Sequence, residues 1–129
     1  MRKIRVYLAT MVLLTALFTA CEEEEQSFEE SLLIGKWKLE RAGDAPGEHM
    51  YERYNADGSG KTWDVADDVQ ESEAQLFTWT LEKSDLTQIH IMEIGGNVPK
   101  YYTVSELTSS SLKYHDDFGK SFSFTKVSN

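Results

Sequence analysis

Short segments in which apolar and polar residues alternate recur along most of this 129-residue chain. The clearest is Leu76 to Glu82, where large apolar side chains alternate with threonine and glutamate. A two-residue period places the large side chains on one face of a β-strand. Turn-forming sequences such as Asn55 to Gly60 and Gly95 to Pro99 separate these segments. The pattern therefore predicts an all-β fold.

The alternating segments predict about eight strands. We expect them at residues 36–41, 49–55, 61–65, 76–82, 86–94, 100–107, 111–115 and 120–127. Short turns join most of them, so the strands should form an antiparallel up-and-down meander. Eight strands in this order close naturally into a barrel, which leaves no strand edge exposed. A two-sheet β-sandwich is the alternative, and the acidic residues 66–75 are expected to form a loop.

One short helix is expected ahead of the strands, from about Phe28 to Ile34. Ser27 and Glu30 have the spacing of a capping box, in which each side chain bonds to the backbone N–H of the other residue. Gly35 then ends the helix, and the alternation of the first strand begins.

The first 20 residues predict a secretory signal, which is removed and takes no part in the fold. A basic head, Met1 to Arg5, precedes an apolar run from Val6 to Phe18. This run of 13 residues is shorter than the roughly 20 that a membrane-spanning helix needs. Ordinary signal peptidase requires a small residue at position −3, but cleavage after Ala20 would place Phe18 there.

The segment Leu17 to Cys21, which ends in the only cysteine of the chain, resembles the lipobox of bacterial lipoproteins. The resemblance implies that Cys21 is acylated and becomes the N-terminus, which would anchor the protein to a membrane. A free or buried thiol is the alternative. The expected organisation is a signal peptide at 1–20, a lipidated cysteine and acidic tether at 21–27, and a folded domain at 28–129.

Acidic residues dominate the chain after the signal. The run Glu22 to Glu25 resembles the signal that directs lipoproteins of one group of Gram-negative bacteria to the outer face of the outer membrane, so we expect a surface-exposed location. From Cys21 onward, 10 basic residues stand against 22 acidic ones, a net charge of −12 once Arg2, Lys3 and Arg5 are removed. Such a surface repels nucleic acids, which excludes them as partners.

The sequence Gly35-Lys-Trp37, directly after the expected helix, resembles the Gly-x-Trp signature of lipocalins and related calycin barrels. Other segments look like the recurring blocks of small lipocalin-like domains in bacterial lipoproteins, namely Tyr54 to Gly60, Phe77 to Leu81, Tyr102 to Leu107 and Phe122 to Val127. The resemblance covers about Leu32 to Val127. It implies a barrel whose closed end is plugged by Trp37.

Two functions are compatible with such a barrel. In the first, the barrel is open at one end and binds a small apolar or amphipathic ligand. The candidate lining residues are Tyr54, Trp63, Phe77, Trp79, Ile89, Tyr102 and Phe122. In the second, aromatic side chains fill the barrel, and the domain is a non-catalytic surface module that contacts protein or glycan partners through its loops. The lipocalin resemblance favours the first.

Motifs for catalysis or metal binding are missing from the sequence. There is no nucleophile elbow, no phosphate-binding glycine loop and no carboxylate pair in apolar context, so we expect neither an enzyme nor a cofactor. His49, His90 and His115 do not have the spacing of metal ligands. Asn55 to Gly60 imitates half of an EF-hand loop, but position 12 would be Ala66 in place of the bidentate glutamate. We expect no metal site.

Overall fold

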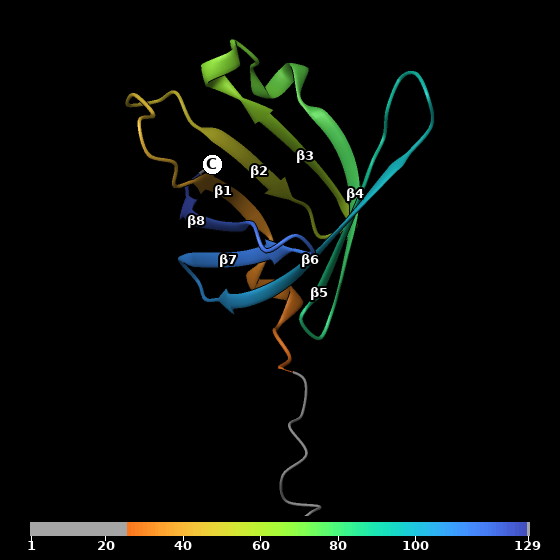
Figure 1. The fold of residues 1–129 in the computed structure, drawn as a ribbon. Helices are drawn as coiled ribbons and strands as arrows, with labels where there is room; N and C mark the ends of the chain where they lie inside the picture. Colours follow the sequence, from red (N-terminus) through yellow and green to blue (C-terminus); the bar gives the residue numbers. More distant parts are fainter. Residues whose placement is uncertain (1–25, 129) are drawn as a thin grey trace, which may run out of the picture.

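The computed structural model describes residues 26–128 and shows a closed β-barrel (Figure 1). Eight antiparallel strands follow in chain order, and β8 pairs with β1 to close the barrel. The strands are β1 (Gly35–Leu39), β2 (Met50–Tyr54), β3 (Ser59–Asp64), β4 (Gln75–Glu82), β5 (Asp85–His90), β6 (Val98–Leu107), β7 (Ser111–Asp116) and β8 (Ser121–Val127). The predicted eight-stranded meander is confirmed, and the β-sandwich alternative is wrong. The expected signal peptide and Cys21 lie outside the described residues.

The predicted N-terminal helix is only a single 3-10 turn, η1 (Glu30–Leu32). Its N-cap is Glu29, and within the described chain no side chain caps it, so the capping box expected at Ser27 does not form. The Phe28 N–H instead donates to the Lys83 carbonyl at 3.3 Å, which binds this segment to the β4–β5 turn. Among residues 26–128, no helix has the length and apolar character needed to cross a membrane.

The two ends of the barrel differ in their connections. Tight turns after β2, β4 and β6 lie at the same end as η1. At the opposite end, which we call the mouth, the connections are residues 40–49, 65–74, 91–97 and 117–120. The second of these carries two 3-10 turns, η2 (Val65–Asp67) and η3 (Glu71–Glu73), and stands at the end away from η1 in Figure 1.

Trp37 occupies the closed end of the barrel. It is fully buried, and its Nε1–H donates to the Leu33 carbonyl at 2.8 Å. Lys126 lies across it, with Nζ 5.1 Å from a ring centroid of Trp37 and 3.2 Å from the Leu32 carbonyl oxygen. Gly35 has φ +134°, and a Cβ there would come within 2.7 Å of the Lys126 side chain. The Gly-x-Trp sequence therefore sets both the turn and the plug.

Large side chains fill the barrel from the closed end to its middle. The fully buried ones include Trp37, Tyr54, Phe77, Phe124, Leu33, Leu86 and Leu112. Gly60, opposite Tyr54 in the β2–β3 register, leaves room for the Phe77 ring, because a Cβ at this position would overlap it. The filled interior places any space for a ligand near the mouth.

Candidate functional site

The structure separates the seven residues predicted to line a cavity. Tyr54, Phe77 and Trp79 do lie inside the barrel and are almost completely buried. The Tyr54 ring centroid is 5.4 Å from that of Phe77 and 5.5 Å from that of Trp79, both in edge-to-face geometry. These rings pack against one another and form core, as aromatic residues on alternating strands usually do.

Trp63 lies on the outer face of the barrel wall, not in the interior as predicted. Its register partner is Tyr51, and the two rings stack with centroids 5.4 Å apart. The neighbour of Tyr51 in the strand, Glu52, points into the barrel, so Tyr51 and Trp63 must point outward. Lys36 covers this pair, with Nζ 4.9 Å from the Tyr51 centroid and 5.3 Å from that of Trp63.

Ile89 also points outward, and its assignment to the interior is wrong. Its side chain is 38% exposed, whereas Gln88 and His90 on either side are buried. Alternation along β5 therefore places two polar residues inside the barrel. The prediction assumed that the isoleucine of this strand faces the core. Gln88 and His90 face the core instead, because both find hydrogen-bond partners there.

Those partners form a buried hydrogen-bond network around Glu52, which is 2% exposed. One carboxylate oxygen accepts hydrogen bonds from the hydroxyls of Tyr114 at 2.8 Å and Tyr54 at 3.1 Å. The other accepts from Nε2 of Gln88 at 3.0 Å, and the same amide donates to the Tyr54 hydroxyl at 2.7 Å. Burial raises the pKa of the Glu52 carboxyl, and these hydrogen bonds oppose the shift. Sequence analysis missed Glu52, although alternation along β2 puts it on the same face as Tyr54, which was predicted to line the interior.

His90 lies at one end of this hydrogen-bond network, beside Phe77. Its Nε2 lies 2.9 Å from Oε1 of Gln88, and because an amide oxygen can only accept, Nε2 carries the proton. The imidazole stacks on Phe77 with centroids 5.3 Å apart. Burial lowers the pKa of His90 to about 4, with a smaller contribution from the positive charge of Lys100. His90 is therefore a neutral interior residue at pH 7.

We expect His90 to make the protein less stable in mild acid. The unfolded chain binds a proton near the ordinary histidine pKa, but the folded chain does so only near pH 4, so stability is lost as pH falls between these values. Urea unfolding at pH 7 and pH 5 measures the loss. His90→Gln should show a smaller loss than the wild type over this interval. An identical loss in both would contradict a neutral, buried His90.

The other two histidines take no part in this hydrogen-bond network. His49 is near the mouth, beside Asp44, and His115 lies in β7. Within residues 26–128, no three His, Cys, Asp or Glu side chains gather in a way that could hold a metal ion.

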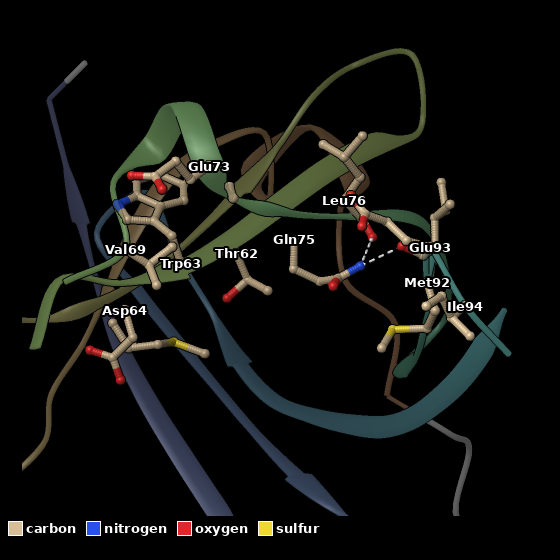
Figure 2. Close-up of a pocket in the computed structure, with 13 residues that line it drawn as sticks. Thr62, Trp63, Asp64, Val69, Glu73, Gln75, Leu76, Met92, Glu93 and Ile94 are labelled. Atoms are coloured by element: carbon tan, nitrogen blue, oxygen red, sulfur yellow. Dashed lines mark hydrogen bonds between the residues drawn. The ribbon is translucent and has the colours of Figure 1, made fainter. Parts of the chain in front are cut away.

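A hollow of about 890 Å³ opens at the mouth, which we call the mouth hollow (Figure 2). Trp63, Val69 and Glu73 stand on one side of it, and Leu76, Met92 and Ile94 on the other, with Thr62 and Gln75 between them. Gln75 Nε2 donates to the carbonyls of Ile91 at 2.6 Å and Leu76 at 3.1 Å, which ties β4 to the β5–β6 loop. The remaining lining residues are Met50, Asp64, Ala74, Ile91 and Glu93. Trp63 thus borders the hollow from outside the barrel interior.

A family model described as a lipocalin-like domain matches residues 33–114. The chain belongs to the lipocalin-like family. The closed eight-stranded barrel and the buried Trp37 fit this assignment, and the resemblance drawn from the sequence is confirmed. Searches among curated proteins and among solved structures found no match.

One wall of the mouth hollow in this lipocalin-like domain is residues 65–74, which we call the strap. It carries η2 and η3, and Val69, Glu73 and Ala74 from it line the hollow. None of these ten described residues is buried. Apolar packing therefore contributes little to holding the strap in place, and its polar contacts must do so.

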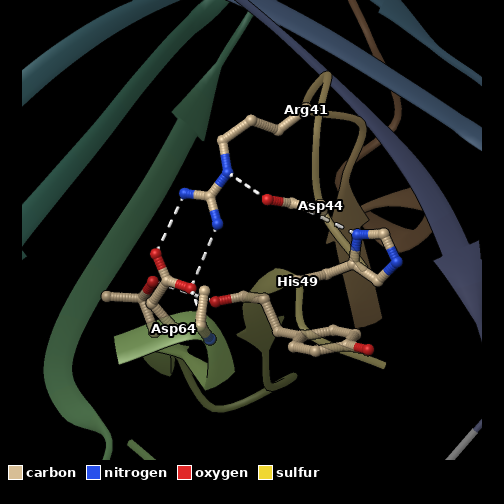
Figure 3. Close-up of polar contacts among 7 residues, drawn as sticks. Arg41, Asp44, His49 and Asp64 are labelled. Atoms are coloured by element: carbon tan, nitrogen blue, oxygen red, sulfur yellow. Dashed lines mark hydrogen bonds and ion pairs between the residues drawn. The ribbon is translucent and has the colours of Figure 1, made fainter. Parts of the chain in front are cut away.

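Arg41 fixes the start of the strap (Figure 3). Its guanidinium bonds both carboxylate oxygens of Asp64, at 2.9 and 3.2 Å, and its Nε–H donates to Asp44 at 2.8 Å. The bond from Arg41 lowers the pKa of Asp64, which also caps η2 by accepting from the Ala66 N–H at 3.1 Å. His49 Nδ1 lies 3.3 Å from the second oxygen of Asp44. Two mouth loops are joined in this way.

Glu71 fixes the middle of the strap to the outside of the barrel. Its carboxylate lies 3.1 Å from Arg53, 3.4 Å from Lys61 and 3.6 Å from Lys36. Partial burial raises the pKa of Glu71, but the hydrogen bonds from Arg53 and Lys61 outweigh this and lower it. One acidic residue thus connects η3 to three strands.

Glu71→Gln should loosen the strap without unfolding the barrel. Partly exposed ion pairs contribute about 0.2–1 kcal/mol, so backbone amide exchange in residues 65–74 should accelerate by a factor of about 1.4 to 5. Hydrogen–deuterium exchange read by mass spectrometry measures this. Glu73→Gln, on the same 3-10 turn but without an ion pair among the described residues, is the control. Unchanged exchange in Glu71→Gln would contradict an electrostatic attachment of the strap.

Proposed function

We propose that this lipocalin-like protein binds a small apolar or amphipathic ligand in the mouth hollow and has no catalytic activity. The observation that carries this proposal is the hollow itself, which has the size of a small-molecule site. Several large apolar side chains on its rim remain in contact with water, including Leu76 at 54% exposure and Ile94 at 90%. A ligand that covers such surface gains about 25 cal/mol for each Å² of apolar area removed from water.

The hollow also offers a small number of polar groups that would orient a ligand. Thr62 and Gln75 lie between the two apolar walls (Figure 2). The Gln75 amide N–H groups are used by the backbone of Leu76 and Ile91, which leaves its carbonyl oxygen to accept a bond from a ligand. This combination of apolar walls and few polar groups supports an amphipathic ligand as well as a purely apolar one.

Titration of the purified full chain with N-phenyl-1-naphthylamine, a neutral apolar dye that fluoresces in apolar surroundings, tests the proposal. We expect saturable binding of one dye per chain. Leu76→Glu puts a charge into the hollow and should weaken binding at least about tenfold. Thr80→Glu, an exposed position of the same strand away from the hollow, should leave it unchanged. Unsaturable binding, or equal binding by Leu76→Glu and the wild type, would overturn the proposal.

We also propose that the domain is tethered by lipid on Cys21 to the outer face of a Gram-negative outer membrane. The support is the sequence around Cys21 and the acidic run after it. The geometry is compatible with a tether, because η1 and Phe28 lie at the closed end of the barrel. Attachment there leaves the mouth directed away from the anchor and open to ligands from the medium.

Cys21→Ser should prevent attachment to the membrane, since the thiol is the group that receives the lipid. Metabolic labelling with an alkyne fatty acid, followed by fractionation of the cells, measures both lipid and location. We expect label and membrane association for the wild type and neither for the variant. Protease added to intact cells should degrade the wild-type domain. Protection from the protease would contradict the outward location.

A second candidate function is contact with a protein or glycan through the mouth loops. The observation that favours it is the exposure of Ile94 and Phe118, at 90% and 95%, on two different loops of the mouth. Single exposed apolar residues are common, but a partner bound across this end of the barrel would remove both side chains from water. Failure of the dye titration, together with a binding partner lost on Ile94→Ser, would favour this function over the first.

A further inference from the structure

We propose that the barrel has a second binding site, for a small aromatic carboxylate, separate from the mouth hollow. The site is a cleft of about 390 Å³ between the start of β6 and the β7–β8 turn, which we call the β6 cleft. It is lined by other residues than the mouth hollow, so it does not depend on the function proposed above.

The floor of the β6 cleft is aromatic. Tyr102 and Phe122 lie edge to face, with centroids 6.0 Å apart and planes at 81°. Both pack on the buried ring of Tyr114, at 4.4 and 5.2 Å, which holds them in place from below. Burial raises the pKa of Tyr102 to about 12, so its hydroxyl is a neutral donor at pH 7. Two fixed rings at right angles can bind a flat aromatic ligand by stacking on one ring and by an edge contact with the other.

Lys100 supplies a positive charge to the cleft, and this charge also acts on the interior, where it lowers the pKa of Glu52 and of His90. Its register partner in β5 is Gln88, whose side chain is buried in the barrel, so Lys100 lies on the inner face of β6. It forms no ion pair with any residue in the described part of the chain. Four other lysines each lie within 4 Å of a carboxylate, namely Lys36, Lys38, Lys61 and Lys113. Lys100 therefore has no ion pair to give up, and a ligand carboxylate would pair with it.

A second lysine lies at the other side of the cleft. Lys120 Nζ is 5.2 Å from the Phe122 ring centroid. The neighbouring carboxylate of Asp116 accepts hydrogen bonds from the backbone N–H groups of Phe118 and Lys120, both at 2.9 Å, so it is used in forming the turn. With Asp117, the lining contains two carboxylates and two lysines. The aromatic floor favours a flat ligand, and Lys100, which has no ion pair within the described residues, is the group that would bind its carboxylate.

Phe118, at the tip of the β7–β8 turn, also borders the cleft and is 95% exposed. An aromatic side chain in this position gains by covering a bound ring, because both apolar surfaces leave water. It would act as a third contact, on the open side of the ligand.

Isothermal titration calorimetry of the purified full chain with 2-naphthoate and with 2-naphthamide tests the site, because these probes have nearly the same shape and differ in charge. A charge-assisted hydrogen bond should make naphthoate bind at least about tenfold more tightly. Lys100→Gln should remove this difference. Lys113→Gln, a lysine of β7 paired with Glu106, is the matched control and should keep it. Phe118→Ser should weaken both probes by the same factor.

Leu76→Glu shows which site the probes occupy. It changes the mouth hollow only, so naphthoate affinity should stay as in the wild type even where the neutral dye no longer binds. Equal affinity for the two probes, absence of naphthoate binding, a loss shared by Lys113→Gln, or a loss in Leu76→Glu would each overturn the β6 cleft as a site for aromatic carboxylates.

Discussion

Trp37→Ala should destabilise the protein by about 3–5 kcal/mol, because it removes the largest fully buried side chain and leaves a cavity at the closed end. It also removes the donor to the Leu33 carbonyl and the ring under Lys126. Denaturant unfolding measured by tyrosine fluorescence and circular dichroism gives the free energy. A loss of this size is a large share of the total stability of a domain this small.

Tyr101→Ala is the matched control for this experiment. It removes an aromatic side chain from β6 of the same barrel, but one that is 57% exposed, whereas Trp37 is fully buried. Its effect should stay within about 0.5 kcal/mol. A Trp37→Ala protein as stable as the Tyr101→Ala protein would mean that Trp37 does not close the barrel.

Glu52→Leu should cost about 2–4 kcal/mol although it replaces a buried charge with an apolar side chain. The hydroxyls of Tyr54 and Tyr114 and the Gln88 amide all donate to this carboxylate, and removing it leaves buried donors without an acceptor. Burial and the negative charge of Glu52 raise the pKa of both tyrosines well above 10, so these hydroxyls remain donors. Urea unfolding at pH 7 measures the cost.

Glu52→Gln separates the hydrogen bonds from the charge. Its amide keeps one acceptor, so the loss at pH 7 should be smaller than for leucine. The folded-state pKa of Glu52 is raised, so its favourable contribution is complete below the unfolded pKa and is lost as pH rises through the folded pKa. The glutamine variant should therefore gain stability relative to the wild type as the pH is raised. A constant difference across pH would show that folding does not raise the pKa of Glu52.

The strands were predictable because their apolar side chains alternate and glycine-rich turns separate them. Trp79 and Phe77 in β4 are an example, since the sequence alone places them on one face and the structure buries both. The short N-terminal helix was overpredicted at Ser27 and Glu30, where a tertiary bond from Phe28 to Lys83 competes with local capping. Local spacing could not reveal that bond.

The site was less predictable, because a cavity depends on where side chains stop filling the barrel. Tyr54 and Phe77 were correctly placed inside, yet they fill the interior and leave the hollow nearer the mouth. Ile89 was misplaced because the sequence does not show that Gln88 and His90 find partners across the barrel, in Glu52 and Phe77. Polar residues inside a barrel are stable only through such long-range contacts.

Native mass spectrometry of the full chain, released gently from the cells that produce it, tests the central claim most directly. If the mouth hollow binds a small molecule, the wild type should carry one additional mass per chain beyond its own covalent modifications. Leu76→Glu should lack this mass, and Thr80→Glu should retain it. The mass of the modified polypeptide alone in all three proteins would contradict a ligand-binding barrel and direct attention to partners of the mouth loops.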